Sequence, residues 1–345
     1  MTGYKDDEYF VEDGQAWEAD LMRPSDAKGV ARLFVSVYGN DYPIRTYLEP
    51  ERLIAENKSG NIISAVARTT GGQVVGHNAM FKSAPYGGIR EAGAGVVHTS
   101  YRGGAGIFTK LTELLQTKGA QDFGVEGVHG EPILSHVFSQ KMCRSLGWIS
   151  HAMEVDLMPA SAYEKEKSAA GRVSALLDFK TLTPKPHRVH IPACYEMELR
   201  FLYSELDDTR EIFISTEKPG AESRSRFNTQ YFDFAQVARI AVWETGNDFA
   251  ALLANEEATL LGRGALVIQV WLSLGQPWIS EAVEELRRRR YFLGGLLPRW
   301  FDHDGILMQK VMQLPNWEGC QVHFDRGRRI FEFVKADWQM SKDRF

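Results

Sequence analysis

The chain has 345 residues, of which 44% are hydrophobic and 25% are charged, so it has the composition of an ordinary globular protein. This length is sufficient for two domains of usual size. The formal net charge of -5 argues against nucleic acid as a partner. The three cysteines and nine histidines lack the spacing of a disulfide scaffold or a metal site, so we expect no metal.

The N-terminal residues 1–18 form a polar, acidic lead-in without the apolar core of a secretory signal. No run in the chain approaches the roughly 18 apolar residues that cross a bilayer, so we expect no membrane partner. The sequence therefore predicts a cytoplasmic protein.

Residues 19–160 are predicted to form an α+β domain that starts with a short strand and a helix. Ser25 or Asp26 would cap this helix, and the apolar residues between Val30 and Val37 repeat at helical spacing. A second helix is expected to end at Gly60.

The middle of this domain has the pattern of a mixed sheet flanked by helices. Gly71 and Gly72 form the turn between the first two of three successive strands. The predicted elements are strands at 61–70, 73–83 and 90–100, a helix from 107 to about 119, a strand at 122–130, a helix at 132–147 and a strand at 148–159. This order is typical of an α+β sandwich and not of a doubly wound fold.

A second domain is predicted at 171–345. The segment 160–171 is small and charged and has no apolar stripe, which favours a domain boundary there. Beyond it, strand and helix patterns alternate, with strands at 238–246, 265–274 and 306–314 and a helix at 277–290. The alternation suggests a weak internal duplication.

A glycine-rich turn, VVHTSYRGGAGI, joins the strand that ends near Val97 to the helix that starts near Ile107. With this turn and the element order, residues 19–158 resemble the GNAT acyltransferase superfamily, whose members bind acetyl-CoA. The family's pyrophosphate loop has the form Q/R-x-x-G-x-G/A after a strand that often ends in Val-His. Here the loop contains one inserted residue, so the first residue of the pyrophosphate loop is either Tyr101 or Arg102.

The resemblance implies that this loop holds the CoA pyrophosphate. Unblocked backbone N–H groups at a helix N-terminus favour a phosphate, and glycines allow it to approach closely. The residues implied in CoA binding are Val96, Val97, His98, Arg102, Gly103, Gly104, Ala105, Gly106 and Ile107 and, on a later helix, Ser139. Without the resemblance, the same glycines would be read as a tight connection only.

The predicted helix at 132–147 carries a second, partial family motif, N-x-x-A-x-x-x-Y-x-x-x-G-F. Counting back from Gly147 and Trp148 places Cys143 at the tyrosine position, Ser139 at the small position and His136 at the asparagine position. The family tyrosine is the proposed acid for the departing thiolate. Cys143 is a candidate for that role or a core residue. His136 is a candidate base or pantetheine ligand, or else a packed or surface histidine.

Acyl transfer to an amine needs a base, because an alkyl amine is mostly protonated at neutral pH. In the family this base is often a carboxylate on the fourth strand, where Glu91 is the only acidic residue. By strand periodicity Glu91 shares a face with Gly93 and Gly95, which would leave room for a substrate. The alternative is a solvated glutamate at a strand entrance.

The segment between the two early helices is irregular and aromatic, and in GNAT proteins this region lines the acceptor site. The resemblance therefore implies acceptor contacts for Tyr38, Asp41, Tyr42 and Tyr47. The alternative is that these aromatic side chains only cover the core.

The sequence thus predicts an acyl-CoA-dependent N-acyltransferase that moves an acetyl group from acetyl-CoA, its cosubstrate, to a primary amine. The C-terminal half would be a degenerate GNAT-like domain, as in tandem GNAT proteins. A non-catalytic acyl-CoA-binding or regulatory module is the alternative, and a longer acyl chain also stays open. The sequence does not determine the oligomeric state.

Overall fold

The computed structural model describes residues 9–40, 42–104, 106–161 and 171–343. The chain divides into two compact units, Met1–Gly130 and Glu131–Phe345. This division precedes the predicted boundary at 160–171, since the strands that flank this segment pair with each other within the second unit. The limits of the predicted domains therefore stay a prediction, whereas the α+β class with a mixed sheet is confirmed.

The first unit contains one mixed sheet and four helices among its described residues. Its strands are β1 (Trp17–Leu21), β2 (Ile62–Thr69), β3 (Val74–Phe81), β4 (Ile89–Val97) and β5 (Gly127–Gly130). Its helices are α1 (Ala27–Tyr38), α2 (Pro50–Ser59), α3 (Ile107–Leu114) and α4 (Ala120–Phe123), and a π-helical turn joins α3 to α4. The strands are in chain order in the sheet, antiparallel except for the parallel pair β4 and β5.

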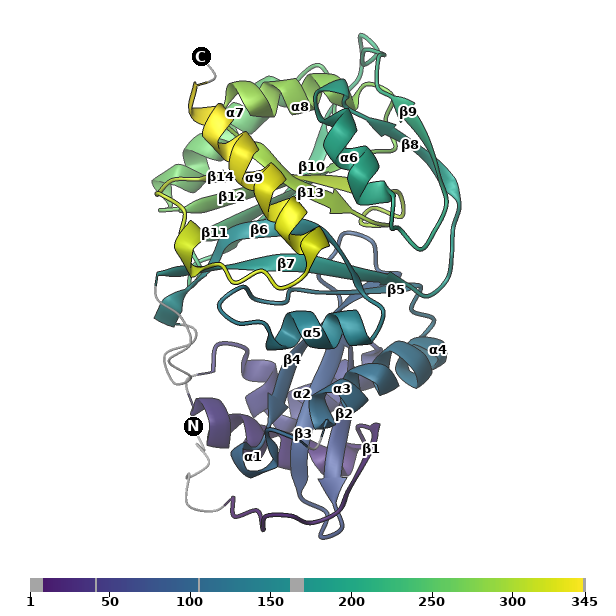
Figure 1. Ribbon diagram of the computed structural model, residues 1–345, viewed down its shortest axis with the longest axis vertical. Coiled ribbons are helices and arrows are strands. Elements are labelled where there is room, and N and C mark those ends of the chain that lie inside the picture. The colour runs from purple at the N-terminus through teal and green to yellow at the C-terminus, as the bar shows by residue number, and fades with distance from the viewer. Residues whose placement is uncertain (1–8, 41, 105, 162–170, 344–345) are drawn as a thin grey trace. The chain divides into compact units, whose positions relative to one another are not determined.

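Two adjacent residues of β3 show which helices cover which face of this sheet. His77 packs its ring against Phe34 of α1, whereas Asn78 donates a 2.8 Å hydrogen bond to the Thr112 hydroxyl of α3. Because successive strand residues point to opposite faces, α1 and α3 cover opposite faces of the sheet. The ribbon in Figure 1 shows α3 crossing the strands of this unit.

The predicted cap of α1 has a different role. Asp26 occupies the N-cap position but forms no side-chain hydrogen bond to the helix. Its carboxylate instead accepts two hydrogen bonds from Arg68 of β2, at 2.7 and 2.5 Å, and both side chains are buried. A buried guanidinium needs a carboxylate partner, and this requirement decides the orientation of Asp26.

The long strands of the second unit also pair in a mixed arrangement. Its strands are β6 (Ile149–Pro159), β7 (Arg172–Thr181), β8 (His187–Ile191), β9 (Arg210–Ile214), β10 (Arg226–Phe232), β11 (Val237–Glu244), β12 (Val267–Ser273), β13 (Phe292–Leu297) and β14 (Gly305–Val311). Its helices are α5 (Phe138–Ser145), α6 (Glu196–Tyr203), α7 (Phe249–Gly262), α8 (Ile279–Arg288) and α9 (Asp325–Asp343). The sheet order is β7-β6-β13-β14-β12-β11-β10, and β8 pairs with β9 separately.

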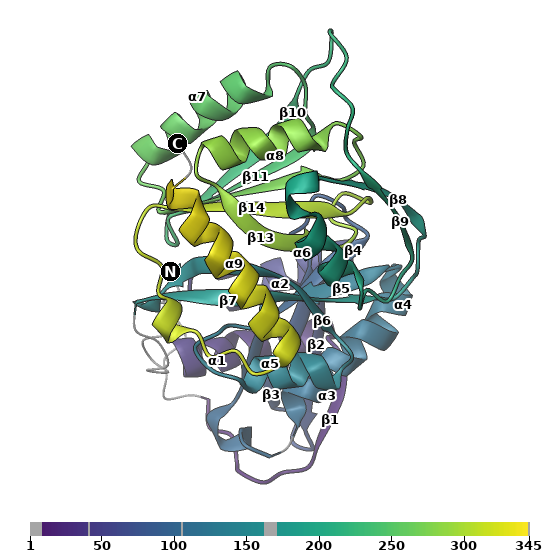
Figure 2. The ribbon, with the colours of Figure 1, turned by 45° about the horizontal axis from the view of Figure 1, so that its top comes forward.

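Helix α9, which the sequence patterns did not predict, is the longest described helix of this unit. It lies across β13 and β6, as both views show (Figures 1 and 2). Its buried side includes Ile330, Val334 and Trp338, which belong to the main core cluster of the unit. No helix in the described parts of the chain has the length and apolar character needed to cross a membrane.

The helix predicted at 132–147 is shorter than expected. Leu134 donates a backbone hydrogen bond to Ser174 of β7, and Ile133 forms an isolated bridge with Ala175. This stretch is therefore extended, and Leu134 is fully buried in the core. As a correction to the sequence prediction, His136 lies before α5 and not on it.

Candidate active site

The glycine-rich turn connects β4 to α3 in the first unit, as predicted. Gly103 and Gly106 have φ values of +86° and +64°, which favour glycine, and Gly106 is the N-cap of α3. Gly104 has no such φ, and a Cβ built on it would meet no atom within 4 Å. The described fold does not need a glycine at 104, so this position leaves room for a ligand.

Tyr101 and Arg102 are the two candidates for the first residue of the predicted pyrophosphate loop, and their surroundings differ. Tyr101 is buried, and its hydroxyl donates to the Glu12 carbonyl at 2.8 Å and accepts from the Gln15 amide at 3.1 Å. It therefore anchors the lead-in. Arg102 is exposed, and its Nε donates to the Val97 carbonyl at 3.1 Å. Arg102 is thus the residue of the two that can present charge at the turn.

The backbone amides of the turn are available for an anion. Within the described residues, which omit Ala105, the N–H groups of Gly103, Gly104 and Gly106 form no hydrogen bond. They precede the N-terminus of α3, where the helix dipole adds partial positive charge. The predicted residue Ala105 lies outside the described residues. Ile107 begins α3 and is buried.

Residues Val96, Val97 and His98 lead into the turn. Val96 is buried in the core under α1, and Val97 pairs with Gly76 of β3. The His98 amide donates to the Val75 carbonyl, and His98 Nδ1 lies 2.7 Å from the Ser100 hydroxyl. This segment therefore holds the turn in place with backbone and side-chain contacts.

Strand β4 contains a bulge beside Glu91. The register places His77 opposite Val96 and Ala79 opposite Gly93, so Ala94 and Gly95 together stand opposite Asn78. Ala94 has a φ of +53°, which is rare for a residue with a side chain. Bulges of this kind occur beside active sites, where they redirect side chains.

The bulge changes one expectation about the space beside Glu91. A Cβ built at Gly93 would lie 3.5 Å from the Glu91 carboxylate, so these two residues are neighbours on one face. A Cβ at Gly95 would fall 2.0 Å from the Phe108 ring of α3, on the opposite face. Gly95 therefore does not share the face of Glu91, because the extra residue of the bulge shifts the alternation of the strand.

Strands β4 and β5 part soon after they begin. Their parallel pairing runs from Ile89 opposite Gly127 to Glu91 opposite His129. From Ala92 to Val97, β4 pairs only with β3 among the described residues of this unit. Beyond Glu91, β4 therefore has one edge that β5 leaves unpaired among the described residues.

The predicted acceptor residues Tyr38, Tyr42 and Tyr47 gather into one aromatic cluster around Phe34. The Tyr38 and Tyr42 ring centroids lie 5.1 Å apart, and the Phe34 and Tyr47 centroids 4.9 Å apart. Tyr38 and Tyr42 are partly exposed, whereas Tyr47 is buried. The predicted residue Asp41 lies outside the described residues.

Glu91 belongs to the same neighbourhood as this cluster. Burial raises the pKa of the Tyr47 hydroxyl, and the nearby Tyr42 and the negative charge of Glu91 raise it further. Since this effect requires short range, the structure brings together Glu91 from β4 and the tyrosines from the α1–α2 connection. Their separation in sequence is more than 40 residues, so only the fold joins them.

Sequence reasoning missed His77, which supports both parts of this neighbourhood. Its Nδ1 lies 3.0 Å from the Ala94 carbonyl and its Nε2 3.1 Å from the Ser64 hydroxyl. The ring is fully buried against Phe34 and Tyr47. A histidine within an apolar strand was the available signal, since a buried imidazole needs hydrogen-bond partners.

The other candidates, His136, Ser139 and Cys143, lie in the second unit. His136 Nδ1 accepts a hydrogen bond from the Phe138 amide at 3.3 Å, at the start of α5. The Ser139 hydroxyl is buried and forms no hydrogen bond to the described residues. Cys143 is buried, and burial together with the charge of Asp178, to which the thiol is hydrogen-bonded, raises its pKa well above the ordinary value.

No protein-family model and no curated protein matches the chain. Among solved structures it is similar to a putative acetyltransferase from Acinetobacter baylyi, with 19% identity over 49% of this chain and 96% of that one and a TM-score of 0.40. It is also similar to a GNAT-family acetyltransferase from Streptococcus pneumoniae, with 16% identity over 48% and 100% and a TM-score of 0.40.

A third similar structure is a putative acetyltransferase from Salmonella typhimurium with its cofactor acetyl-CoA, with 15% identity over 49% of this chain and 96% of that one and a TM-score of 0.39. Each of these three solved structures corresponds to about half of this chain.

Proposed function

We propose that the chain is an acyl-CoA-dependent N-acyltransferase whose first unit holds acetyl-CoA and passes the acetyl group to a primary amine. The observation that carries this proposal is the free backbone of the turn at Gly103, Gly104 and Gly106. Three amides without protein partners, at the start of a helix and beside Arg102, suit a pyrophosphate.

A matched turn in the second unit provides the contrast. There the connection from β11 to α7 also joins a strand to a helix, but its amides are occupied. The Thr245 amide donates to Gln276 Oε1 at 3.0 Å, Gly246 to Ser225 Oγ at 2.9 Å and Asn247 to the Ser223 carbonyl at 3.2 Å. A phosphate would find no free donor among them, which supports CoA binding by the first unit only.

The parallel strand pair beside each of these turns also differs between the two units. In the second unit β11 and β12 stay paired from Val237 to Val242, whereas β4 and β5 separate after Glu91. The free edge of β4 presents backbone donors and acceptors in strand geometry. This edge suits the two amides of the pantetheine arm, and a β4 amide would polarise the thioester carbonyl that acetyl-CoA supplies.

In this proposal Glu91 removes a proton from the bound ammonium group so that the neutral amine attacks the thioester carbonyl directly. The C–N bond forms, the C–S bond breaks, and CoA leaves as its thiolate, which takes up the proton that the nitrogen then loses. Gly93 lies beside the Glu91 carboxylate, and the Phe81 ring packs against Gly93, 3.2 Å from where a Cβ would lie. Tyr38 and Tyr42, which are partly exposed, form the aromatic wall that receives the acceptor. His77 acts as a positioning residue, because it holds the bulge of β4 through the Ala94 carbonyl.

We also propose that the second half is a degenerate repeat of the first. The helix ends of α5 and α8 support this relation: Gly147 and Arg290 have φ values of +77° and +66°, respectively. After each, the next amide reaches back five residues, from Trp148 to Cys143 and from Tyr291 to Leu286, both at 3.0 Å. Arg290 thus has the left-handed conformation that favours the glycine of the family motif.

Measurements of CoA binding and turnover on the full chain test the function. Gly104→Asp adds a negative side chain in open space, so we expect a normal fold and at least tenfold weaker acetyl-CoA binding by calorimetry. Gly220→Asp is the matched control, because its Cβ also meets no atom within 4 Å and its φ is ordinary. Equal binding by both variants would contradict the loop assignment.

Turnover across a panel of primary amines separates the enzyme from the non-catalytic acyl-CoA-binding module. Glu91→Gln should lower kcat by about 100-fold or more and leave CoA affinity unchanged. One observation favours the module. Cys143, at the position where the family has its acid, is a buried thiol that is hydrogen-bonded to Asp178. CoA binding without turnover of any amine would support the module.

A further inference from the structure

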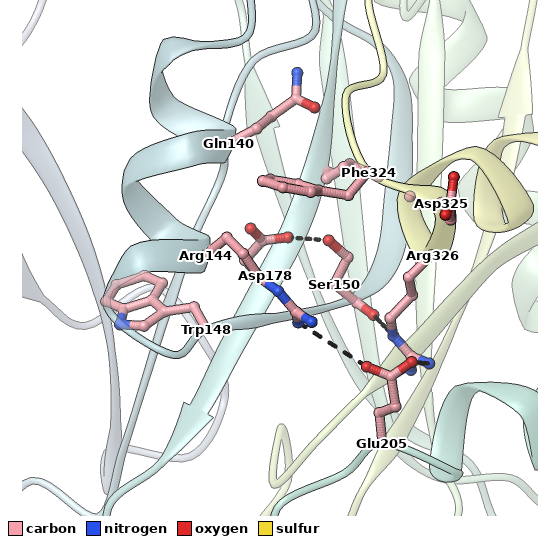
Figure 3. A pocket seen from close by; sticks show the side chains of 11 residues that line it. Gln140, Arg144, Trp148, Ser150, Asp178, Glu205, Phe324, Asp325 and Arg326 are labelled. Atoms are coloured by element: carbon pink, nitrogen blue, oxygen red, sulfur yellow. Dashed lines mark hydrogen bonds and ion pairs between the residues drawn. The ribbon is translucent and has the colours of Figure 1, made fainter.

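The second unit contains a cavity of about 240 Å³ between α5, β6, β7 and the start of α9 (Figure 3). None of its lining residues is assigned to acyl transfer above. A water molecule takes about 30 Å³ in the liquid, so the space accommodates several waters or one small organic molecule. The side chains of Asp178, Ser150, Arg144 and Phe324 gather around it.

Most of the charges around this cavity are matched within the protein. Arg326 is buried, pairs with Glu205 at 3.4 Å and donates to the Ser150 and Leu202 carbonyls, both at 2.7 Å. The carboxylate of Asp325 pairs with Arg328. Two lining charges are more weakly matched: among the described residues the Asp178 carboxylate forms no ion pair, and the Arg144 guanidinium forms only a long one, with Glu205 at 3.9 Å.

Asp178 forms the buried end of the cavity. It is 4% exposed, and its Oδ1 accepts a 2.6 Å hydrogen bond from the Ser150 hydroxyl, while the Cys143 thiol donates a second. Both donors are neutral, and no cation within the described residues lies within 4 Å of it. Burial raises the pKa of Asp178 to about 6, so the carboxylate is mostly ionised at neutral pH.

Arg144 supplies the opposite charge at the more exposed part of the lining. Its side chain is 52% exposed, and its nearest carboxylate, that of Glu205, lies 3.9 Å away, beyond hydrogen-bond distance. Its planar donors are suited to a ligand carboxylate. Trp148, Leu176 and Phe324 add apolar surface to the lining of the cavity.

We propose that this cavity binds a small zwitterion, a free α-amino acid, with its ammonium group on Asp178 and its carboxylate on Arg144. The ammonium would replace the missing cation beside a buried carboxylate, and the apolar part of the ligand would pack against Phe324. A simple amine offers no partner to Arg144, and a simple acid offers none to Asp178. The cavity therefore favours a ligand that carries both signs.

Calorimetry and tryptophan fluorescence of the full chain without acetyl-CoA test this proposal. The probes are leucine, serine, glutamate and lysine, each compared with the amine that lacks its carboxylate and the acid that lacks its amino group. At least one amino acid should bind, and its two analogues should each bind tenfold or more weakly. Trp148→Phe should reduce the fluorescence change. No binding by any of these amino acids, or equal binding of an amine, would overturn the proposal.

Variants locate the ligand in the second unit. Asp178→Asn, which keeps an acceptor for Ser150, and Arg144→Gln, a change at a half-exposed side chain, should each weaken binding about tenfold or more. Arg188→Gln is the control, a surface arginine whose side chain is 72% exposed and paired with Glu211. If Asp178→Asn fails to fold, Arg144→Gln decides alone.

Glu91→Gln distinguishes this site from the proposed acceptor site. Amino-acid binding should persist in Glu91→Gln and fall in Arg144→Gln. The reverse pattern would place the ligand at the acceptor site and overturn the proposal, while leaving the acyltransferase function intact. Loss of turnover in Glu91→Gln with amino-acid binding retained would support both.

Discussion

The Nδ1 atom of His77 lies 3.0 Å from the carbonyl oxygen of Ala94, the bulge residue of β4. Nε2 of the same ring lies 3.1 Å from the Ser64 hydroxyl, so one buried imidazole joins β2, β3 and β4. The assignment that satisfies both contacts has Nδ1–H as donor to Ala94 and Nε2 as acceptor from Ser64. The bulge beside Glu91 is therefore held by a neutral histidine.

His77→Leu should damage the proposed acyl transfer more than CoA binding. The change leaves the Ala94 carbonyl unpaired and removes one of the two hydrogen bonds of the Ser64 hydroxyl, which keeps the one from the Asn57 amide. It should lower stability by about 1 to 3 kcal/mol. We expect kcat to fall about tenfold or more with the KM for acetyl-CoA unchanged. His77→Asn, whose amide can still donate to Ala94, should recover part of kcat. Identical kinetic constants for the His77→Leu and His77→Asn variants would show that His77 only fills space.

The same residue should make the first unit sensitive to acid. Burial lowers the pKa of His77 to about 4, from 6.5 in an unfolded chain. Between these values the unfolded state binds more protons, so stability is lost as pH falls from about 6.5 towards 4. Over this pH range the protonation of His77 should lower the free energy of unfolding by about 3 kcal/mol in total. Urea unfolding of the wild type and His77→Asn at pH 7.5 and 4.5 checks this, and a difference that does not change with pH would contradict it.

Asp178 should produce the opposite trend in the second unit. Burial raises its pKa to about 6, although Ser150, Arg144, Cys143 and Arg326 act to lower it. The folded state therefore takes up the proton before the unfolded chain does, and this group destabilises the fold above about pH 6 and progressively less below it. Asp178→Asn should be more stable than wild type at pH 8, by up to about 3 kcal/mol.

The gain from Asp178→Asn should shrink as pH falls towards 4, because the wild-type carboxyl then becomes neutral as well. Unfolding midpoints of the two proteins over this pH range provide the measurement. Ser150→Ala is an informative second variant, since it removes the donor to Asp178 and should enlarge the effect of pH. A constant difference between wild type and Asp178→Asn would argue that the carboxyl titrates normally.

Gly295 of β13 should tolerate no side chain. Its φ is +136°, and a Cβ would lie 2.5 Å from the His151 carbonyl oxygen and 2.6 Å from Ala152 Cα of β6. Gly295→Ala must therefore displace the backbone pairing of β13 with β6, and we expect a loss of about 2 to 4 kcal/mol. Gly104→Ala is the control and should change stability by less than about 0.5 kcal/mol. Thermal unfolding of both variants tests the contrast.

Local sequence patterns predicted much of the first unit and less of the second. The stripe from Val30 to Val37 and the Gly71–Gly72 turn are confirmed, because spacing and turn chemistry act over a few residues. Leu134 was misread as helical, since an apolar residue in a buried extended segment has the same composition as one in a helix. Helix α9 went unpredicted because its apolar positions are interrupted by buried Arg326 and Asp337.

The sequence by itself determined most of the order of elements in the first unit, the glycine-rich turn before α3 and the residues from which a site can be chosen. The tertiary structure alone decided that Ala94 and Gly95 form a bulge, that the amides of Gly103, Gly104 and Gly106 have no partner among the described residues while those at 245–247 are occupied, and that Asp178 is buried without an ion pair to the described residues. These properties depend on partners far away in the chain, such as Asn78, Gln276 and Ser150, and local patterns do not specify which distant groups will meet.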